Sequence, residues 1–153
     1  MECLLIGGAQ SVGKSESIYR LAKYLISQGF KDNLNMVPAT FQDFKAILER
    51  VDSNGKLVRI IINSPTDTPE IIQKFKDFYD NNGNYDILIS SIRDNIPGPR
   101  NDFFKIMGIC SALEIPLAKI TRRDSNKRLA LKWYQDKVDE LLIHTLKNNP
   151  FLI

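Results

Sequence analysis

The 153-residue sequence has only two cysteines, one histidine and one tryptophan, and its charges nearly balance, with 21 Lys and Arg against 18 Asp and Glu. Cys3 and Cys110 are too few for a disulfide framework and too far apart for a Cys-x-x-Cys site, so we expect two buried, reduced thiols. A net charge of +3 without a concentrated basic patch argues against binding to nucleic acid or to a membrane surface.

Long apolar runs and targeting features are missing as well. No stretch approaches the roughly 18–20 apolar residues that cross a bilayer, and residues 1–6 lack the basic start of a secretory signal. With 43% hydrophobic and 25% charged residues, the composition is that of a globular chain rather than a disordered one. We therefore expect one soluble, cytoplasmic domain over residues 1–153, without contact to a membrane.

Short apolar runs alternate with longer segments of helical periodicity. The predicted strands cover residues 3–7, 34–37 (a weak one), 57–62, 86–90 and 117–120. The predicted helices cover residues 13–28, 41–51, 68–79, 102–113 and 125–147, with a capping box of Thr40 and Asp43 before the second and a loop at 95–101. Continuous apolar strands are typical of parallel sheets covered on both faces. We predict an α/β fold, a three-layer α/β/α domain with a mainly parallel five-stranded sheet.

The first predicted strand runs into Gly8-Ala9-Gln10-Ser11-Val12-Gly13-Lys14-Ser15, which matches the pattern G-x-x-x-x-G-K-[ST]. Gly8 and Gly13 let the backbone turn tightly, so that consecutive N–H groups form a nest for an anion at the start of a helix. Lys14 reaches the β- and γ-phosphates as a point charge, and the Ser15 hydroxyl serves as a ligand for Mg²⁺. The motif predicts a polyphosphate site.

On this motif, the chain resembles the P-loop nucleoside triphosphate hydrolase superfamily, and its small size is most similar to the small P-loop kinases. The resemblance implies that residues 8–15 bind ATP or GTP together with Mg²⁺. It also implies a kinase-like phosphotransferase that moves the γ-phosphoryl group of ATP to a nucleoside, a nucleotide or a small hydroxyl acceptor. The GTPase subclass is disfavoured, because Asn126-Lys127-Arg128-Leu129 lacks the acid of the guanine motif N-K-x-D.

The second acidic motif of that family, four apolar residues ending in Asp, is not matched. The run at 58–62 ends in Asn63, and the run at 87–89 ends in Ser90. Asp67 and Asp94 follow these ends and are the candidate carboxylates for the metal. Asp67 suits the cap of the next helix equally well, and Asp94 suits surface pairing with nearby arginines.

Polar residues follow the predicted strands, and ligands bind at the carboxyl ends of strands in open parallel sheets. These residues are Asn63, Ser64, Thr66 and Asp67, then Ser90, Ser91, Arg93 and Asp94, and last Thr121, Arg122 and Arg123. In kinases of similar layout, arginines near the last strand close over the phosphates, which assigns a catalytic role to Arg122 and Arg123. Lys127 and Arg128 extend this basic cluster, which also fits a solvated helix start.

Two classes of function stay open. The late arginines favour the phosphotransferase, with a nucleoside triphosphate and a small-molecule acceptor as its partners. The missing second acid favours a nucleotide-responsive regulatory ATPase or binding module, in which ATP orders residues 91–101 and 124–127 for a protein partner. A degenerate domain that binds only a free anion is the third reading.

Overall fold

The computed structural model of the chain describes residues 1–9, 11–93, 97–120 and 126–153. Five strands and four helices lie in these residues. The strands are β1 (Glu2–Gly7), β2 (Lys45–Val51), β3 (Leu57–Asn63), β4 (Ile87–Ile92) and β5 (Leu113–Pro116). The helices are α1 (Lys14–Ser27), α2 (Pro69–Asn81), α3 (Pro97–Met107) and α4 (Lys127–Leu146).

The strands form one sheet in the order β2-β3-β4-β1-β5. β1 pairs in parallel with β4 and with β5, and β3 pairs in parallel with β4, whereas β2 is antiparallel to β3. The α/β class and the five strands are confirmed, and the sheet is mixed. Because β1, β3, β4 and β5 run in one direction, their carboxyl ends meet at the same edge of the sheet.

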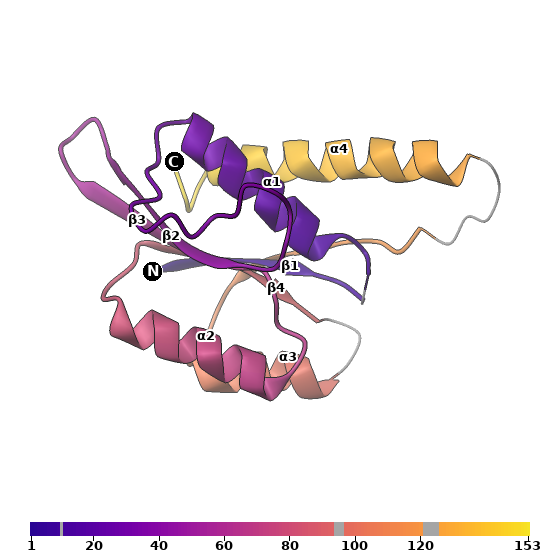
Figure 1. Cartoon of the computed structure of the whole chain (residues 1–153), viewed down its shortest axis with the longest axis horizontal. Coiled ribbons are helices and arrows are strands. Elements are labelled where there is room, and N and C mark those ends of the chain that lie inside the picture. Colours follow the sequence, from indigo (N-terminus) through magenta and orange to yellow (C-terminus); the bar gives the residue numbers. More distant parts are fainter. Residues whose placement is uncertain (10, 94–96, 121–125) are drawn as a thin grey trace.

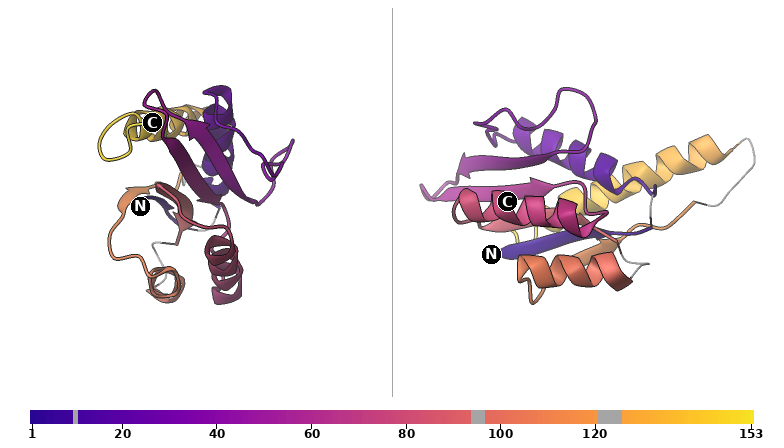
Figure 2. Two further views of the ribbon diagram at one scale, coloured as in Figure 1. Left: turned by 90° about the vertical axis from the view of Figure 1, so that its left-hand side faces the viewer. Right: turned by 60° about the horizontal axis from the view of Figure 1, so that its bottom comes forward.

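Helices cover both faces of the sheet, with α1 and α4 on one side and α2 and α3 on the other (Figure 1). Successive side chains of β1 point to opposite faces of the sheet and therefore pack against both helix layers. Leu4 and Ile6 join the cluster of α1 and α4, whereas Cys3 and Leu5 join the cluster of α2 and α3. Figure 2 shows the same sandwich from two further sides. Burial on both faces fixes β1 at the centre of the molecule.

Residues 45–51, predicted as part of a helix, form the edge strand β2. Ala46 and Leu48 are buried on the α1 side and Ile47 on the α2 side, an alternation that only an extended chain produces. The turn at residues 52–55 closes a hairpin with β3. The predicted extended piece at 34–37 is not a strand, and Thr40 and Asp43 cap no helix. The helix predicted at 41–51 and the strand predicted at 57–62 thus correspond, in the structure, to the two strands of the β2–β3 hairpin.

The chain after β4 is shifted relative to the prediction. Helix α3 begins at Pro97, inside the predicted loop, and ends at Met107 before Gly108, which has a φ of +66°. Strand β5 occupies Leu113–Pro116 instead of residues 117–120. Pro97 is compatible with the start of α3, because proline is favoured in the first turn of a helix. Pro116 is compatible with β5, because proline is tolerated in an edge strand.

Cys110, expected to be buried, lies at the surface. Trp133 and Leu141 are also exposed, on α4. Cys3 is buried as expected, and burial raises the pKa of its thiol. In the part of the chain that is described, no helix has the length and apolar character of a membrane span.

The carboxylate of Asp86 ties together the starts of β3 and β4, and it makes stability depend on pH. It accepts the Lys56 ammonium at 2.7 Å and the Arg59 backbone N–H at 2.9 Å. These two bonds, the Lys56 bond first, lower the pKa of Asp86. The stabilisation is therefore present above the unfolded-state pKa of about 4 and is lost as the pH falls through the folded-state pKa.

Asp86→Asn should lower the free energy of unfolding by about 1 kcal/mol near neutral pH. Urea denaturation of both proteins at a series of pH values measures this difference. It should shrink steadily as the solution is made more acidic. A difference that stays constant into the acid range would contradict this role for the Asp86 charge.

Candidate functional site

Between the end of β1 at Gly7 and the start of α1 at Lys14, the backbone takes three positive φ angles. They are +147° at Gly8, +60° at Ser11 and +93° at Gly13. A Cβ atom at Gly8 would lie 2.8 Å from Val12 Cγ2 and 3.2 Å from the Leu117 carbonyl oxygen. Gly8 is thus required by its conformation and by the close approach of two segments. Gln10 lies outside the described residues.

Lys14 closes this turn from within. Its side chain is buried, with 8% of the residue exposed, and its Nζ donates to the carbonyl oxygens of Gly8 at 2.9 Å and Ala9 at 2.7 Å. The first helical bond of α1 runs from the Ser17 N–H to the Gly13 carbonyl, which leaves the N–H groups of the first turn without partners inside the helix. A buried ammonium and a helix N-terminus therefore meet at the carboxyl end of β1, an arrangement that attracts anions.

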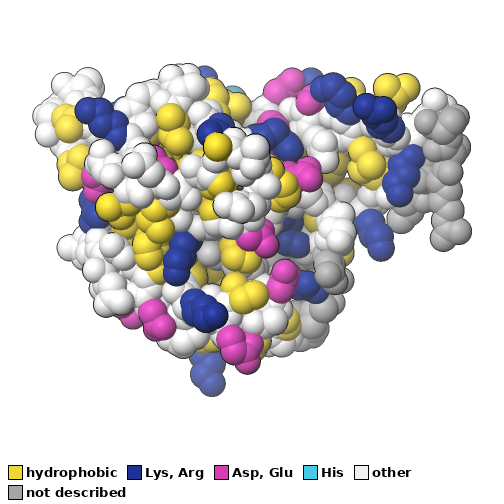
Figure 3. All heavy atoms as spheres, in the orientation of Figure 1, with side chains coloured by type: hydrophobic (Ala, Val, Ile, Leu, Met, Phe, Trp, Pro, Cys, Tyr) yellow, Lys and Arg dark blue, Asp and Glu magenta, His cyan; other side chains and the backbone are white. Residues whose placement is uncertain are grey.

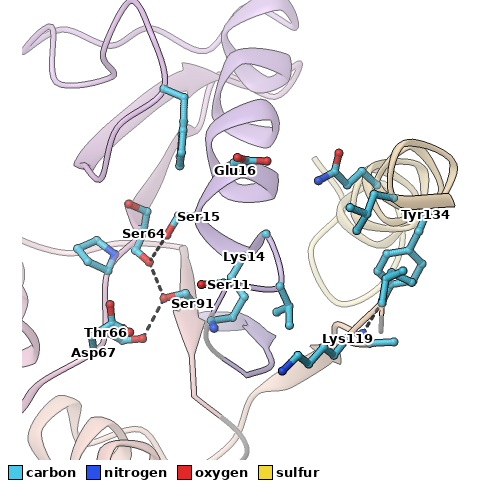
Figure 4. A pocket seen from close by; sticks show the side chains of 18 of the residues that line it. Ser11, Lys14, Ser15, Glu16, Ser64, Thr66, Asp67, Ser91, Lys119 and Tyr134 are labelled. Atoms are coloured by element: carbon cyan, nitrogen blue, oxygen red, sulfur yellow. Dashed lines mark hydrogen bonds between the residues drawn. The ribbon is translucent and has the colours of Figure 1, made fainter. Parts of the chain in front are cut away.

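Hydroxyl groups from three elements gather around the carbonyl oxygen of Ser64 (Figure 4). It accepts the Ser15 hydroxyl at 3.3 Å and the Ser91 hydroxyl at 2.5 Å. The Thr66 hydroxyl lies 2.9 Å from that of Ser91. Ser91, with Ser90, lies inside β4 rather than beyond it, because that strand extends to Ile92. Of the polar residues expected at this edge, Ser64 thus contacts the first turn of α1, and Ser91 and Thr66 complete the hydrogen-bonded group.

Asn63 occupies the end of β3. Its Nδ2 donates to the Pro65 carbonyl at 2.8 Å and to the Ser90 hydroxyl at 3.3 Å, so the side chain braces the turn after β3. Asp43, read from the sequence as a helix-capping acid, instead accepts the Ser64 hydroxyl at 3.2 Å. It reaches Ser64 because β2 is antiparallel to β3.

Asp67 pairs with Arg93, whose Nη2 and Nε lie 2.7 Å and 2.8 Å from one carboxylate oxygen of Asp67. The capping alternative for Asp67 is wrong, because the Thr68 side chain caps α2 by accepting the Ile71 N–H. Arg100 forms two hydrogen bonds with the carboxylate of Glu114. Asp94, Thr121, Arg122 and Arg123 lie outside the described residues.

A cavity of about 870 Å³ opens over the loop. One wall carries Ser64, Thr66, Asp67 and Ser91, the floor carries residues 11–16, and the opposite wall comes from the link after β5 and from α4. That opposite wall consists of Ala118, Lys119, Ile120, Lys127, Leu131, Tyr134 and Gln135. Lys and Arg side chains gather over the amino-terminal part of α4 (Figure 3). The cavity thus joins the loop to a hydroxyl-rich wall and a partly apolar, basic one.

Of the second wall, the sequence indicated Lys127 as part of a basic cluster and missed the other residues. Tyr134 packs against the core, and its Oη also accepts the Ala118 N–H at 2.6 Å at the cavity. Lys119 belongs to the strand predicted at 117–120, so the sequence did not indicate its place in the link that lines the cavity. The proline at position 116, which ends β5, is the signal that marks the correct boundary.

Comparisons with protein-family models, curated proteins and solved structures return no match for this chain.

Gly8 offers a direct test of the turn. Gly8→Ala places a methyl group 2.8 Å from Val12 at a φ that L-residues avoid, so it should lower the free energy of unfolding by about 1–3 kcal/mol. Gly98→Ala is the matched control, because no atom of the described residues outside its own helix backbone and chain neighbours lies within 4 Å of its Cβ position, and its φ is outside the left-handed region. Chemical denaturation measures both variants. Equal stability of the two would contradict the close approach at Gly8.

Proposed function

We propose that the protein binds ATP with Mg²⁺ at residues 8–15 and transfers the γ-phosphoryl group to a small hydroxyl-bearing acceptor. The observation that carries this proposal is the turn between β1 and α1, closed by the Lys14 ammonium and open to a cavity of about 870 Å³. That volume lies in the range of small-molecule sites, about 300–1,000 Å³.

The phosphate-binding part of the proposal rests on Lys14. Its ammonium is held by the neutral carbonyl oxygens of Gly8 and Ala9. These bonds already involve the charged ammonium, but a carbonyl oxygen carries no net charge, whereas a phosphate adds the attraction of its negative charge, so a polyphosphate competes for this group. The N-terminus of α1 at Lys14 favours the same negative charge.

The two walls of the cavity suggest the direction of the bound nucleotide. Ile120, Leu131 and Tyr134 offer apolar surface for a base. The opposite wall presents the hydroxyl and carbonyl groups of Ser64, Thr66 and Ser91. A terminal phosphate and an acceptor hydroxyl find more polar groups there than on the apolar wall. We therefore expect the nucleoside against the α4 wall and the γ-phosphate toward Ser64.

The oxygen donors at the cavity fit a magnesium ion. The hydroxyl of Ser15 and the carboxylate of Asp67 both line it, although no group of three His, Cys, Asp or Glu side chains is found in the described residues. Mg²⁺ commonly takes one or two protein ligands and completes its shell with water and phosphate. Ser15 and Asp67 would hold the ion, Asp67 through water, and the bound ion would neutralise charge on the phosphates.

The residues of the chain contribute mainly by positioning. Lys14 orients the β- and γ-phosphates, while Ser91 and Thr66 hold the Ser64 carbonyl beside Ser15. Arg122 and Arg123 stay in the proposal as the cations that offset charge during transfer, as their place after the last strand suggests.

A nucleotide-responsive regulator is the second candidate, and one observation favours it. Asn63 stands at the end of β3 and braces Pro65, and the Asp67 carboxylate is engaged by Arg93. A site with its cavity carboxylate paired in this way is better suited to hold a nucleotide than to turn it over rapidly. In that case ATP binding, rather than phosphoryl transfer, would carry the function.

The nucleotide site is tested by Lys14→Ala. Saturating ATP–Mg²⁺ should raise the melting temperature of the wild-type protein by about 5 °C or more, because a ligand of the native state stabilises it. Lys14→Ala should remove this shift, whereas Lys23→Ala, at an exposed position on the same helix, should keep it. An undiminished shift in folded Lys14→Ala protein, with the fold checked by circular dichroism, would contradict the site.

Turnover separates the two candidates. ADP production is measured with ATP alone and with a panel of nucleosides, nucleotides and small hydroxyl metabolites. The phosphotransferase proposal predicts that at least one acceptor accelerates ADP formation about ten-fold or more, with phosphorylated acceptor as the product. Slow ADP formation that no acceptor changes, in a protein that ATP stabilises, would support the regulator instead.

A further inference from the structure

The link from β5 to α4 is anchored against the phosphate loop. The Leu117 N–H donates to the Gly7 carbonyl at 2.8 Å, which continues the pairing of β5 with β1 by one residue. The Leu117 carbonyl lies 3.2 Å from the Cβ position of Gly8. On the other side, the Ala118 N–H donates to Tyr134 Oη at 2.6 Å. Hydrogen bonds thus fix Leu117 to β1 and Ala118 to α4.

Lys119 is the first residue beyond these anchors, and its side chain enters the cavity. Figure 4 shows it extending from the β5–α4 link toward the side on which Ser11 and Lys14 lie. The backbone that carries it is held in place, while the four-carbon stem stays exposed and adjustable. The ammonium of Lys119 therefore faces the loop from the wall opposite the hydroxyl groups.

The charges around the cavity leave Lys119 without an anionic partner. Among the residues that the structure describes, it forms no salt bridge and no side-chain hydrogen bond. The carboxylates that line the cavity are occupied, since Glu16 lies 3.8 Å from Arg20 and Asp67 pairs with Arg93 at 2.7 Å. Lys14 and Lys127 also line the cavity, so its lining has three ammonium groups and two carboxylates.

We propose that Lys119 is a second phosphate-binding residue, which contacts the phosphates of the bound nucleotide from the side opposite Lys14. The inference rests on the proposed function and adds a grip on the nucleoside-proximal phosphates, because Lys119 belongs to the wall assigned to the base. A ligand with several linked phosphates spans both ammonium groups, whereas a single phosphate occupies only one. The site is accordingly selective for nucleotides with a polyphosphate chain.

Titration calorimetry with ATP, inorganic tripolyphosphate and adenosine tests this role. Lys119→Ala should weaken binding of ATP and of tripolyphosphate about ten-fold, through the loss of one charge-assisted contact, and leave adenosine binding unchanged. Lys119→Arg keeps the charge and should stay within about three-fold of the wild type. Lys132→Ala, on an exposed α4 residue paired with Asp136, should bind all three ligands as the wild type does.

The outcomes separate this inference from the proposed function. Wild-type affinity for ATP and tripolyphosphate in Lys119→Ala protein overturns the inference and leaves the nucleotide site standing. An equal loss for adenosine also overturns it, because a contact with phosphate cannot weaken a ligand that has none. A wild-type protein that binds tripolyphosphate but not ATP overturns the proposal that the ligand is a nucleotide. The phosphate-binding role of Lys119 is then tested by the affinity of Lys119→Ala protein for tripolyphosphate alone. A wild-type protein that binds neither ligand overturns both proposals.

Discussion

The burial of β1 on both faces is the constraint from which the rest of the molecule follows. Leu4, Leu5 and Ile6 are fully buried, and the strand is hydrogen-bonded to β4 on one side and to β5 on the other. A strand fixed in this way delivers the loop after Gly7 to one defined point at the edge of the sheet. The chain must pass from this internal strand to the start of α1 at Lys14 within a few residues, next to the Leu117 carbonyl, and it does so by a tight turn into which Lys14 points.

The same edge collects the groups that distinguish this chain. β4 pairs with β1, and β3 pairs with β4. Asn63, Ser64 and Ser91 lie at the ends of these two strands, and the hydrogen bonds of these residues, one of them from Ser15, form a neutral network. Negative charge at this wall is balanced locally, by Arg93 on Asp67. The side chains that line the cavity include three lysines, Lys14, Lys119 and Lys127, and only two carboxylates, and the proposed ligand is therefore an anion with several charges.

The sequence predicted the features that depend on local patterns. The turn before α1, strands near residues 57–62 and 86–90 and a helix that opens near Thr68 follow from short motifs and apolar runs, although the sequence makes Asp67 the candidate cap of that helix. The sequence predicted a helix where β2 lies. Ala46, Ile47 and Leu48 are buried on opposite faces of the sheet, so all three are apolar and the apolar–polar alternation typical of a half-exposed strand is missing. The pairing of Arg93 with Asp67 and the place of Lys119 depend on which strands are neighbours, and no local pattern encodes that.

The central claim is that residues 8–15 wrap the phosphates of a nucleotide with backbone amides. Its most direct test is the ¹H–¹⁵N correlation spectrum of the labelled protein, recorded while ATP–Mg²⁺ is added. The account predicts that the largest changes fall on the amides of this loop and of the first turn of α1, with smaller ones at Ser64 and at the link after β5. Saturation with the main changes elsewhere, or no change at all, would contradict it.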